Sequence, residues 1–226
     1  VTAAGEEPIT IPLRVEVFDF AMPVRSPLPM VWHFAGERRV NKFVGDETAW
    51  ERNAEAYYDT LHDYYITSDV LYGGRLPEWD YLQRIEEEGR LAGFRVGDWY
   101  HGLFGMTPSK PASEQTASFR KLVERYRENV ERARELGLVD KAYIYGFDER
   151  PGRYFDLMRE SGKVLKEAFP DVLLMTTAGD LTFGEKVPVV DIWVPLTRDY
   201  HVPRAERARA KGKQVWWYVC VEPKHA

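Results

Sequence analysis

The sequence predicts an α/β protein of the (β/α)8 barrel type, truncated after about the seventh strand. Short apolar segments alternate with helix-like segments along most of the 226 residues, the order typical of a parallel sheet covered by helices. Seven such apolar segments follow residue 28, whereas eight strands close a barrel. The composition, 44% hydrophobic and 30% charged, is that of a folded domain rather than a disordered chain.

The barrel strands are expected in seven runs, which are Pro29–Phe34, Ser68–Tyr72, Phe94–Trp99, Lys141–Asp148, Val172–Ala178, Val190–Leu196 and Gln214–Val221. Leu13–Phe20 also alternates apolar and polar residues, but its connection to the next run is too short for a parallel crossover. We therefore predict that residues 1–25 hold a linker and the last strand of an absent preceding domain. Residues 26–226 would form the incomplete barrel.

Helices are predicted between these strands, at Thr48–Tyr65, Glu78–Leu91, Ser113–Leu136, Pro151–Phe169 and Pro203–Lys211. Ser113–Leu136 has the clearest signal, because its apolar residues recur every three or four positions and Gly137 suits a left-handed helix cap. An open doubly wound sheet is the alternative. No glycine-rich phosphate loop follows the first strand, which disfavours a nucleotide-binding version of that fold.

Charge and composition disfavour several classes of function. The net charge is −5, and the arginines of the 113–136 segment alternate with glutamates, so no basic stripe for nucleic acid is expected. No apolar stretch is long enough to span a membrane. Cys220 is the single cysteine, and His33, His101 and His201 lack the spacing of a zinc motif. We expect neither a metal nor a cofactor.

Asp148 and Glu149 are the leading candidates for catalysis, because reactive groups of parallel barrels gather where strands end. Strand alternation is expected to turn Ala142, Ile144, Gly146 and Asp148 into the barrel, with Tyr143, Tyr145 and Phe147 under the helices. Two close carboxylates resist simultaneous ionisation, so one tends to stay protonated and can serve as a general acid. The competing interpretation is an exposed acidic pair at the start of the next helix.

Aromatic and polar residues at the same rim are candidates for substrate binding. They are Trp99, His101, Tyr200, Trp217, Tyr218 and Glu222. Flat rings stack on the C–H faces of sugars, and carboxylates accept hydrogen bonds from sugar hydroxyls. The rim is therefore suited to glycoside cleavage, which needs a proton donor and stabilisation of an oxocarbenium-like transition state. Core packing explains Trp99 and Trp217 equally well.

Several motifs give the chain a family resemblance. They are GLVDKAYIYGFDERPG (residues 137–152), FPD (169–171), DIWVP (191–195) and KGKQVWWYVC (211–220). Together they resemble glycoside hydrolase family 123 and its wider relatives, the domain of unknown function 4091. The resemblance runs from about Val15 and is strongest from Leu138 to Pro223. The opening VEVFDFAMP looks like the join between that family's N-terminal β-sandwich and its barrel.

The resemblance implies β-N-acetylgalactosaminidase activity on a glycan, by substrate-assisted retaining catalysis. The substrate's acetamido oxygen would attack the anomeric carbon, so neither an enzyme nucleophile nor a metal is needed. The family's acid pair corresponds to Asp148, which would orient the acetamido N–H, and to Glu149, which would protonate the leaving oxygen and later activate water. It further implies an absent N-terminal β-sandwich, an absent C-terminal barrel segment and export from the cell. Arg150 is a departure, since in the family Pro typically follows the pair directly.

Two alternatives remain open from the sequence. Glu149 and Glu222 would suit a conventional retaining glycosidase with an acid/base and a nucleophile, if their carboxyl groups lie about 5–5.5 Å apart. A non-catalytic carbohydrate-binding barrel would keep the aromatic residues without needing both acids. The intact acid pair favours the enzyme.

Overall fold

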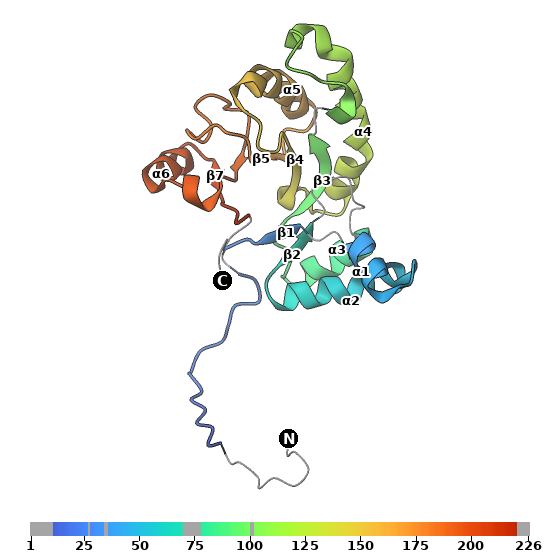
Figure 1. Ribbon diagram of the computed structural model, residues 1–226, viewed down its shortest axis with the longest axis vertical. Coiled ribbons are helices and arrows are strands. Elements are labelled where there is room, and N and C mark those ends of the chain that lie inside the picture. Colours follow the sequence, from blue (N-terminus) through green and yellow to red (C-terminus); the bar gives the residue numbers. More distant parts are fainter. Residues whose placement is uncertain (1–10, 27, 34–35, 70–77, 100–101, 221–226) are drawn as a thin grey trace.

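The computed structural model describes residues 11–26, 28–33, 36–69, 78–99 and 102–220. Within them the strands form two sheets (Figure 1). The smaller sheet pairs β1 (Val31–His33) with β2 (Thr67–Asp69), in parallel. The larger, entirely parallel sheet has the order β3 (Phe94–Trp99), β4 (Ala142–Gly146), β5 (Leu173–Thr176), β6 (Ile192–Trp193) and β7 (Gln214–Val215).

The α-helices are α1 (Gly36–Val44), α2 (Ala49–Asp63), α3 (Trp79–Glu87), α4 (Thr116–Glu135), α5 (Phe155–Ala168) and α6 (Val202–Ala210). Short 3-10 turns lie at Gly102–Phe104, Ala112–Gln115, Val139–Lys141, Gly152–Tyr154 and Thr197–Asp199. None of the helices in the described ranges could cross a membrane.

The predicted order of elements is confirmed. A strand lies within or beside each of the seven apolar runs after residue 28, although β6 and β7 have two residues each. All five predicted helices are present, with bounds that differ by a few residues. The helix α1 was not predicted. It precedes α2 in the sequence, and the two pack together.

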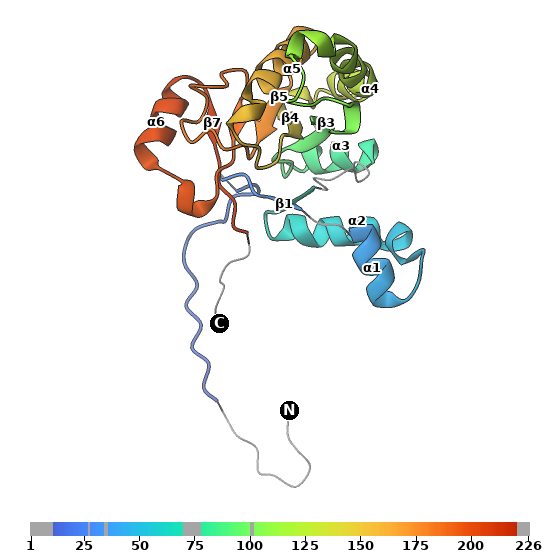
Figure 2. The ribbon, with the colours of Figure 1, turned by 45° about the horizontal axis from the view of Figure 1, so that its top comes forward.

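Leu13–Phe20, predicted to be the last strand of an absent preceding domain, is not a strand in the described part of the chain, and the predicted domain stays untested. The segment has no regular structure, and its apolar side chains are exposed, with Leu13 at 86% and Val17 at 88% of full exposure. It runs away from the folded body in both views (Figures 1 and 2). A strand needs a hydrogen-bonded neighbour, and no described strand pairs with this segment.

The architecture is mixed α/β and is consistent with a truncated barrel. β2 lies against β3, but the strands of the smaller and larger sheets are not hydrogen-bonded to one another in the described ranges. Helices α3, α4 and α5 cover one face of the β3 to β5 region, and α6 flanks β7 (Figure 1). The other face has its own smaller apolar cluster. Barrel closure and the absent sandwich domain stay predictions.

The alternation of side chains along β4 is the reverse of the prediction. Ala142 and Ile144 belong to the main core, which includes the apolar side chains of the covering helices. Tyr143 and Tyr145 belong to the opposite cluster, with Met175 of the neighbouring strand. The physical reason is that small side chains let the helices approach the sheet, whereas a buried tyrosine hydroxyl needs a polar partner. The face away from the helices provides that partner.

The backbone conformation of Phe147 turns the Asp148 side chain to the face of the sheet away from the helices, as predicted. The Phe147 φ of 53° lies in the left-handed region, so the regular alternation breaks after β4. The Phe147 ring is fully buried on the helix side, in edge-to-face contact with Trp99 at 4.9 Å between ring centroids. Burying such a ring contributes about 1.5–3 kcal/mol, which offsets the roughly 1–2 kcal/mol that a left-handed non-glycine residue costs.

Gly146 leads into this turn at a point where no side chain fits. A Cβ atom there would overlap the carbonyl carbon and oxygen of Trp99 on the adjacent strand. We predict that Gly146→Ala lowers the free energy of unfolding by about 1–3 kcal/mol or more, measured by urea denaturation. Gly152→Ala is the matched control, because the nearest atom to its Cβ, on Phe155, lies at 3.7 Å. Equal stability of the two variants would contradict the proposed clash.

Candidate active site

Asp148 and Glu149 form the turn that follows β4, at the carboxyl end of the sheet. The two residues that flank Asp148 have strained backbone conformations, since Phe147 has φ 53° and Glu149 has φ 48°. Residues in this region cost of order 1–3 kcal/mol and cluster at functional sites, where surrounding contacts hold them in place. The backbone is held here by a hydrogen bond from the Arg150 N–H to the Phe147 carbonyl, at 3.1 Å.

Two hydroxyl groups fix the carboxylate of Asp148. The Tyr145 hydroxyl donates to Oδ1 of Asp148 at 2.6 Å, and the Thr177 hydroxyl donates to the same oxygen at 2.7 Å. The two hydroxyls lie 3.2 Å apart. Asp148 is half-buried, so its carboxylate is held in one orientation at the edge of the open face.

Thr177 also contacts the second acid through its backbone. The N–H of Glu149 donates to the Thr177 hydroxyl oxygen at 2.9 Å. A single side chain that follows β5 therefore accepts from Glu149 and donates to Asp148. Because β4 and β5 are adjacent and parallel, with Tyr145 opposite Met175, their ends lie side by side and allow this bridge.

Tyr218 reaches the same turn from the segment after β7. Its hydroxyl donates a short hydrogen bond to Oε1 of Glu149. Partial burial, together with that carboxylate, raises the pKa of Tyr218 above its ordinary value. The phenol consequently stays protonated across the working pH range of proteins and remains a donor to Glu149. Glu149 itself is exposed.

The arrangement joins two adjacent carboxylates with different surroundings. Asp148 is held by two hydroxyls, whereas Glu149 is exposed and contacts one phenol. A fixed acid suits the orientation of a substrate group, and an exposed acid suits proton transfer to and from water.

The model of the family described as "Glycoside hydrolase 123, catalytic domain" matches residues 103–226, more than half of the chain.

The chain belongs to glycoside hydrolase family 123. Cleavage of a glycosidic bond is therefore the chemistry of this family 123 domain. The matched region includes β4 to β7, with Asp148, Glu149, Thr177 and Tyr218. Among curated proteins, none matches the chain.

Trp99 was expected either to bind substrate or to pack in the core, and its position in the family 123 domain favours core packing. Its ring is fully buried in the main core on the helix side of the sheet. Its Nε1 donates to the Ser161 hydroxyl of α5 at 2.9 Å. The cause is the irregular register of β3 between Arg95 and Gly97, which changes the alternation before Trp99.

Tyr200 and Trp217 form a separate aromatic pair. Their ring centroids lie 5.7 Å apart, and the Tyr200 hydroxyl accepts from Arg209 of α6 at 2.9 Å. Trp216 and Tyr218 pack on the face away from the helices, whereas Tyr200 packs against the main core. Tyr218 therefore contacts Glu149 of the acid pair, whereas Trp217 packs beside Tyr200. Sugar binding by Tyr200 and Trp217 stays a prediction.

His101 and Glu222 lie outside the described residues, so their predicted roles in substrate binding are untested. The side chain of His33, which was considered for metal binding, also lies outside the described part of the chain. In the part of the chain that the structure describes, no group of His, Cys, Asp and Glu side chains could hold a metal ion.

Sequence reasoning missed Tyr145 and Thr177. Tyr145 was assigned to the helix side because alternation was extended through Phe147, which has the left-handed conformation. Thr177 follows β5, directly beside the acid turn. A hydroxyl residue at the end of the strand next to the acidic pair is a signal that the sequence does contain.

Thr177 offers a direct test of this geometry. We predict that Thr177→Val, which removes the hydroxyl at nearly constant volume, costs about 1–3 kcal/mol of stability because the half-buried Asp148 carboxylate loses a hydrogen bond. The turnover number should fall more than the Michaelis constant rises, since the change misorients the acids. Thr60→Val on the exposed face of α2 is the control. Wild-type turnover in Thr177→Val would contradict the positioning role.

Proposed function

We propose that the protein hydrolyses terminal β-linked N-acetylhexosamine, in the first place N-acetylgalactosamine, by substrate-assisted retaining catalysis. The family membership supports glycoside hydrolysis. The observation that supports the finer mechanism is the hydrogen-bonded unit in which Thr177 contacts both Asp148 and Glu149. Two adjacent acids held in this way can act on neighbouring parts of one sugar.

Asp148 is assigned to the acetamido group of the substrate. Its carboxylate accepts two hydroxyl hydrogen bonds on Oδ1, so it is oriented before substrate arrives. A fixed carboxylate can accept the acetamido N–H and stabilise the positive charge that develops when the acetamido oxygen bonds to the anomeric carbon. Groups that are already oriented need little reorganisation during reaction, which is where such electrostatic stabilisation gains its effect.

Glu149 is assigned to proton transfer. In the first step its carboxyl proton passes to the glycosidic oxygen, the bond from that oxygen to the anomeric carbon breaks, and the acetamido oxygen forms a bond to that carbon. In the second step the Glu149 carboxylate takes a proton from water, whose oxygen displaces the acetamido oxygen. Its exposure gives water access, and the Tyr218 hydroxyl on Oε1 restrains its side chain.

Substitution of each acid tests these roles in the complete natural chain. With an aryl β-N-acetylgalactosaminide, Glu149→Gln should lower the turnover number by about 10²–10⁴-fold, as expected for loss of a general acid. Asp148→Asn should lower it by about 10²–10³-fold, as expected for loss of one stabilising group. Binding should be retained in both variants. Asp140→Asn, at the opposite end of β4, is the control. Unchanged turnover in either acid variant would remove its assigned role.

Fluorination of the substrate's acetyl group tests whether the acetamido oxygen is the nucleophile. Each added fluorine makes the acetamido oxygen less nucleophilic, so turnover should fall progressively from the acetyl to the trifluoroacetyl glycoside. Full activity on a glycoside without the acetamido group would instead support a conventional mechanism, in which Glu149 is the acid/base and Glu222 is the nucleophile. Binding without hydrolysis of any of these compounds would support a non-catalytic carbohydrate-binding barrel.

A further inference from the structure

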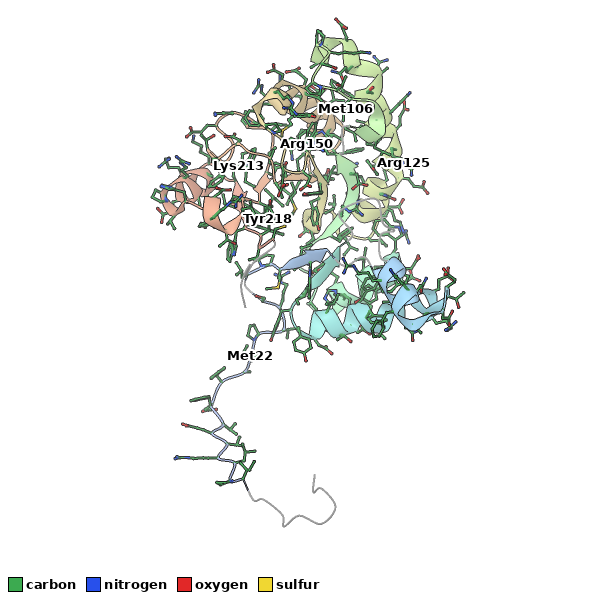
Figure 3. The ribbon with its side chains drawn as sticks, viewed as in Figure 1. Met22, Met106, Arg125, Arg150, Lys213 and Tyr218 are labelled. Carbon is green, nitrogen blue, oxygen red and sulfur yellow. The ribbon has the colours of Figure 1, made fainter. Side chains whose placement is uncertain are left out.

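Arg150 directly follows the two acids in the turn after β4. Its backbone is fixed on both sides. The Arg150 N–H donates to the Phe147 carbonyl at 3.1 Å, and its carbonyl accepts from the Gly179 N–H at 3.0 Å. The backbone of Arg150 therefore belongs to the same hydrogen-bonded turn as the acids. Figure 3 labels Arg150 near the end of β4.

The guanidinium of Arg150 is incompletely satisfied within the described residues. Its Nε atom is buried and has no hydrogen-bond partner there. The guanidinium carbon lies 5.5 Å from the centroid of the Tyr154 ring, a cation–π contact that orients the group without satisfying its N–H donors. A buried donor without a partner is unfavourable, so the Arg150 guanidinium is left incompletely hydrogen-bonded by the described part of the chain.

Arg153 brings a second positive charge to the same ring. Its guanidinium carbon lies 5.3 Å from the Tyr154 centroid. Within the described ranges no carboxylate forms an ion pair with Arg150 or Arg153. By contrast, Arg159 of α5 forms an ion pair with Asp156. Two unpaired guanidinium groups beside one ring leave a local excess of positive charge.

We propose that Arg150 and Arg153 form an anion-binding subsite that recognises a sulfate ester or a carboxylate on the glycan. Guanidinium groups bind such oxyanions through paired, directional N–H donors. The positive charges of the subsite would also offset electrostatic repulsion, because Asp148 and Glu149 by themselves would repel an anionic sugar. Because Arg150 follows Glu149 in the same turn, the proposed anion is taken to be part of the glycan that is cleaved. In that respect the inference rests on the proposed function.

The test measures binding, so that it is independent of turnover. Glu149→Gln protein, in the complete natural chain, is titrated calorimetrically with N-acetylgalactosamine, its 4-sulfate and its 6-sulfate. A disaccharide that contains glucuronic acid and the same disaccharide with glucose in its place form the carboxylate arm. At least one anionic ligand should bind about tenfold more tightly than its neutral counterpart, as expected for a charge-assisted hydrogen bond. The arm with the larger ratio identifies the anion.

Arginine substitutions then assign the preference to the subsite. Adding Arg150→Gln should bring the ratio of anionic to neutral affinity close to one, and Arg150→Lys should leave an intermediate ratio because charge remains while the Nε donor is lost. Arg153→Gln should lower the ratio and carries the test if an Arg150 variant fails to fold. Arg125→Gln, an exposed arginine on α4 labelled in Figure 3, is the matched control and should keep the full ratio.

A ratio near one in the parent protein, or a ratio that Arg150→Gln and Arg153→Gln leave unchanged, would overturn the subsite. This failure is distinguishable from failure of the proposed function. Hydrolysis of the neutral aryl glycoside with no charge preference would leave the hydrolase and remove the anion site. An Arg150-dependent preference without hydrolysis of any acetamido glycoside would do the reverse.

Discussion

The hydroxyl of Thr177 is the contact on which the candidate site depends. It donates to the carboxylate of Asp148 and accepts from the backbone N–H of Glu149, so one side chain after β5 fixes two acids after β4. This bridge requires the two strands to be adjacent and parallel, with their carboxyl ends at one edge. The parallel sheet therefore places Thr177 within hydrogen-bonding distance of Glu149 and Asp148, which lie 28 and 29 positions before it in the sequence.

Local strain is the second constraint on the site. Phe147 and Glu149 both have left-handed φ values, and without the first of them Asp148 would point toward the helices. The strain is tolerated because the Phe147 ring is buried against Trp99 and because the turn's backbone groups are hydrogen-bonded on both sides. Packing of the core and orientation of the acids are thus coupled, since the same turn contributes to both. The family match covers this turn and its partners on the next strands.

The sequence was sufficient for the order of elements and for the position of the acid pair after a strand, because alternating periodicity and strand ends are local signals. It was insufficient for the direction of side chains. A single left-handed residue at Phe147 and an irregular register between Arg95 and Gly97 reversed the expected faces of Tyr145 and Trp99. Both depend on contacts between strands, which no local pattern records. The proposed roles of Thr177 and Arg150 likewise depend on their neighbours in the fold.

In the proposed mechanism, Asp148 and Glu149 contact neighbouring parts of one amino sugar. The most direct measurement is a crystal structure of the complete natural chain with the thiazoline derived from N-acetylgalactosamine, a mimic of the cyclised acetamido group. We expect the Asp148 carboxylate within hydrogen-bonding distance of the ring nitrogen and Glu149 beside the anomeric carbon, on the side of the departing oxygen. A ligand bound away from this turn, or one whose anomeric carbon faces a different carboxylate, would contradict the account.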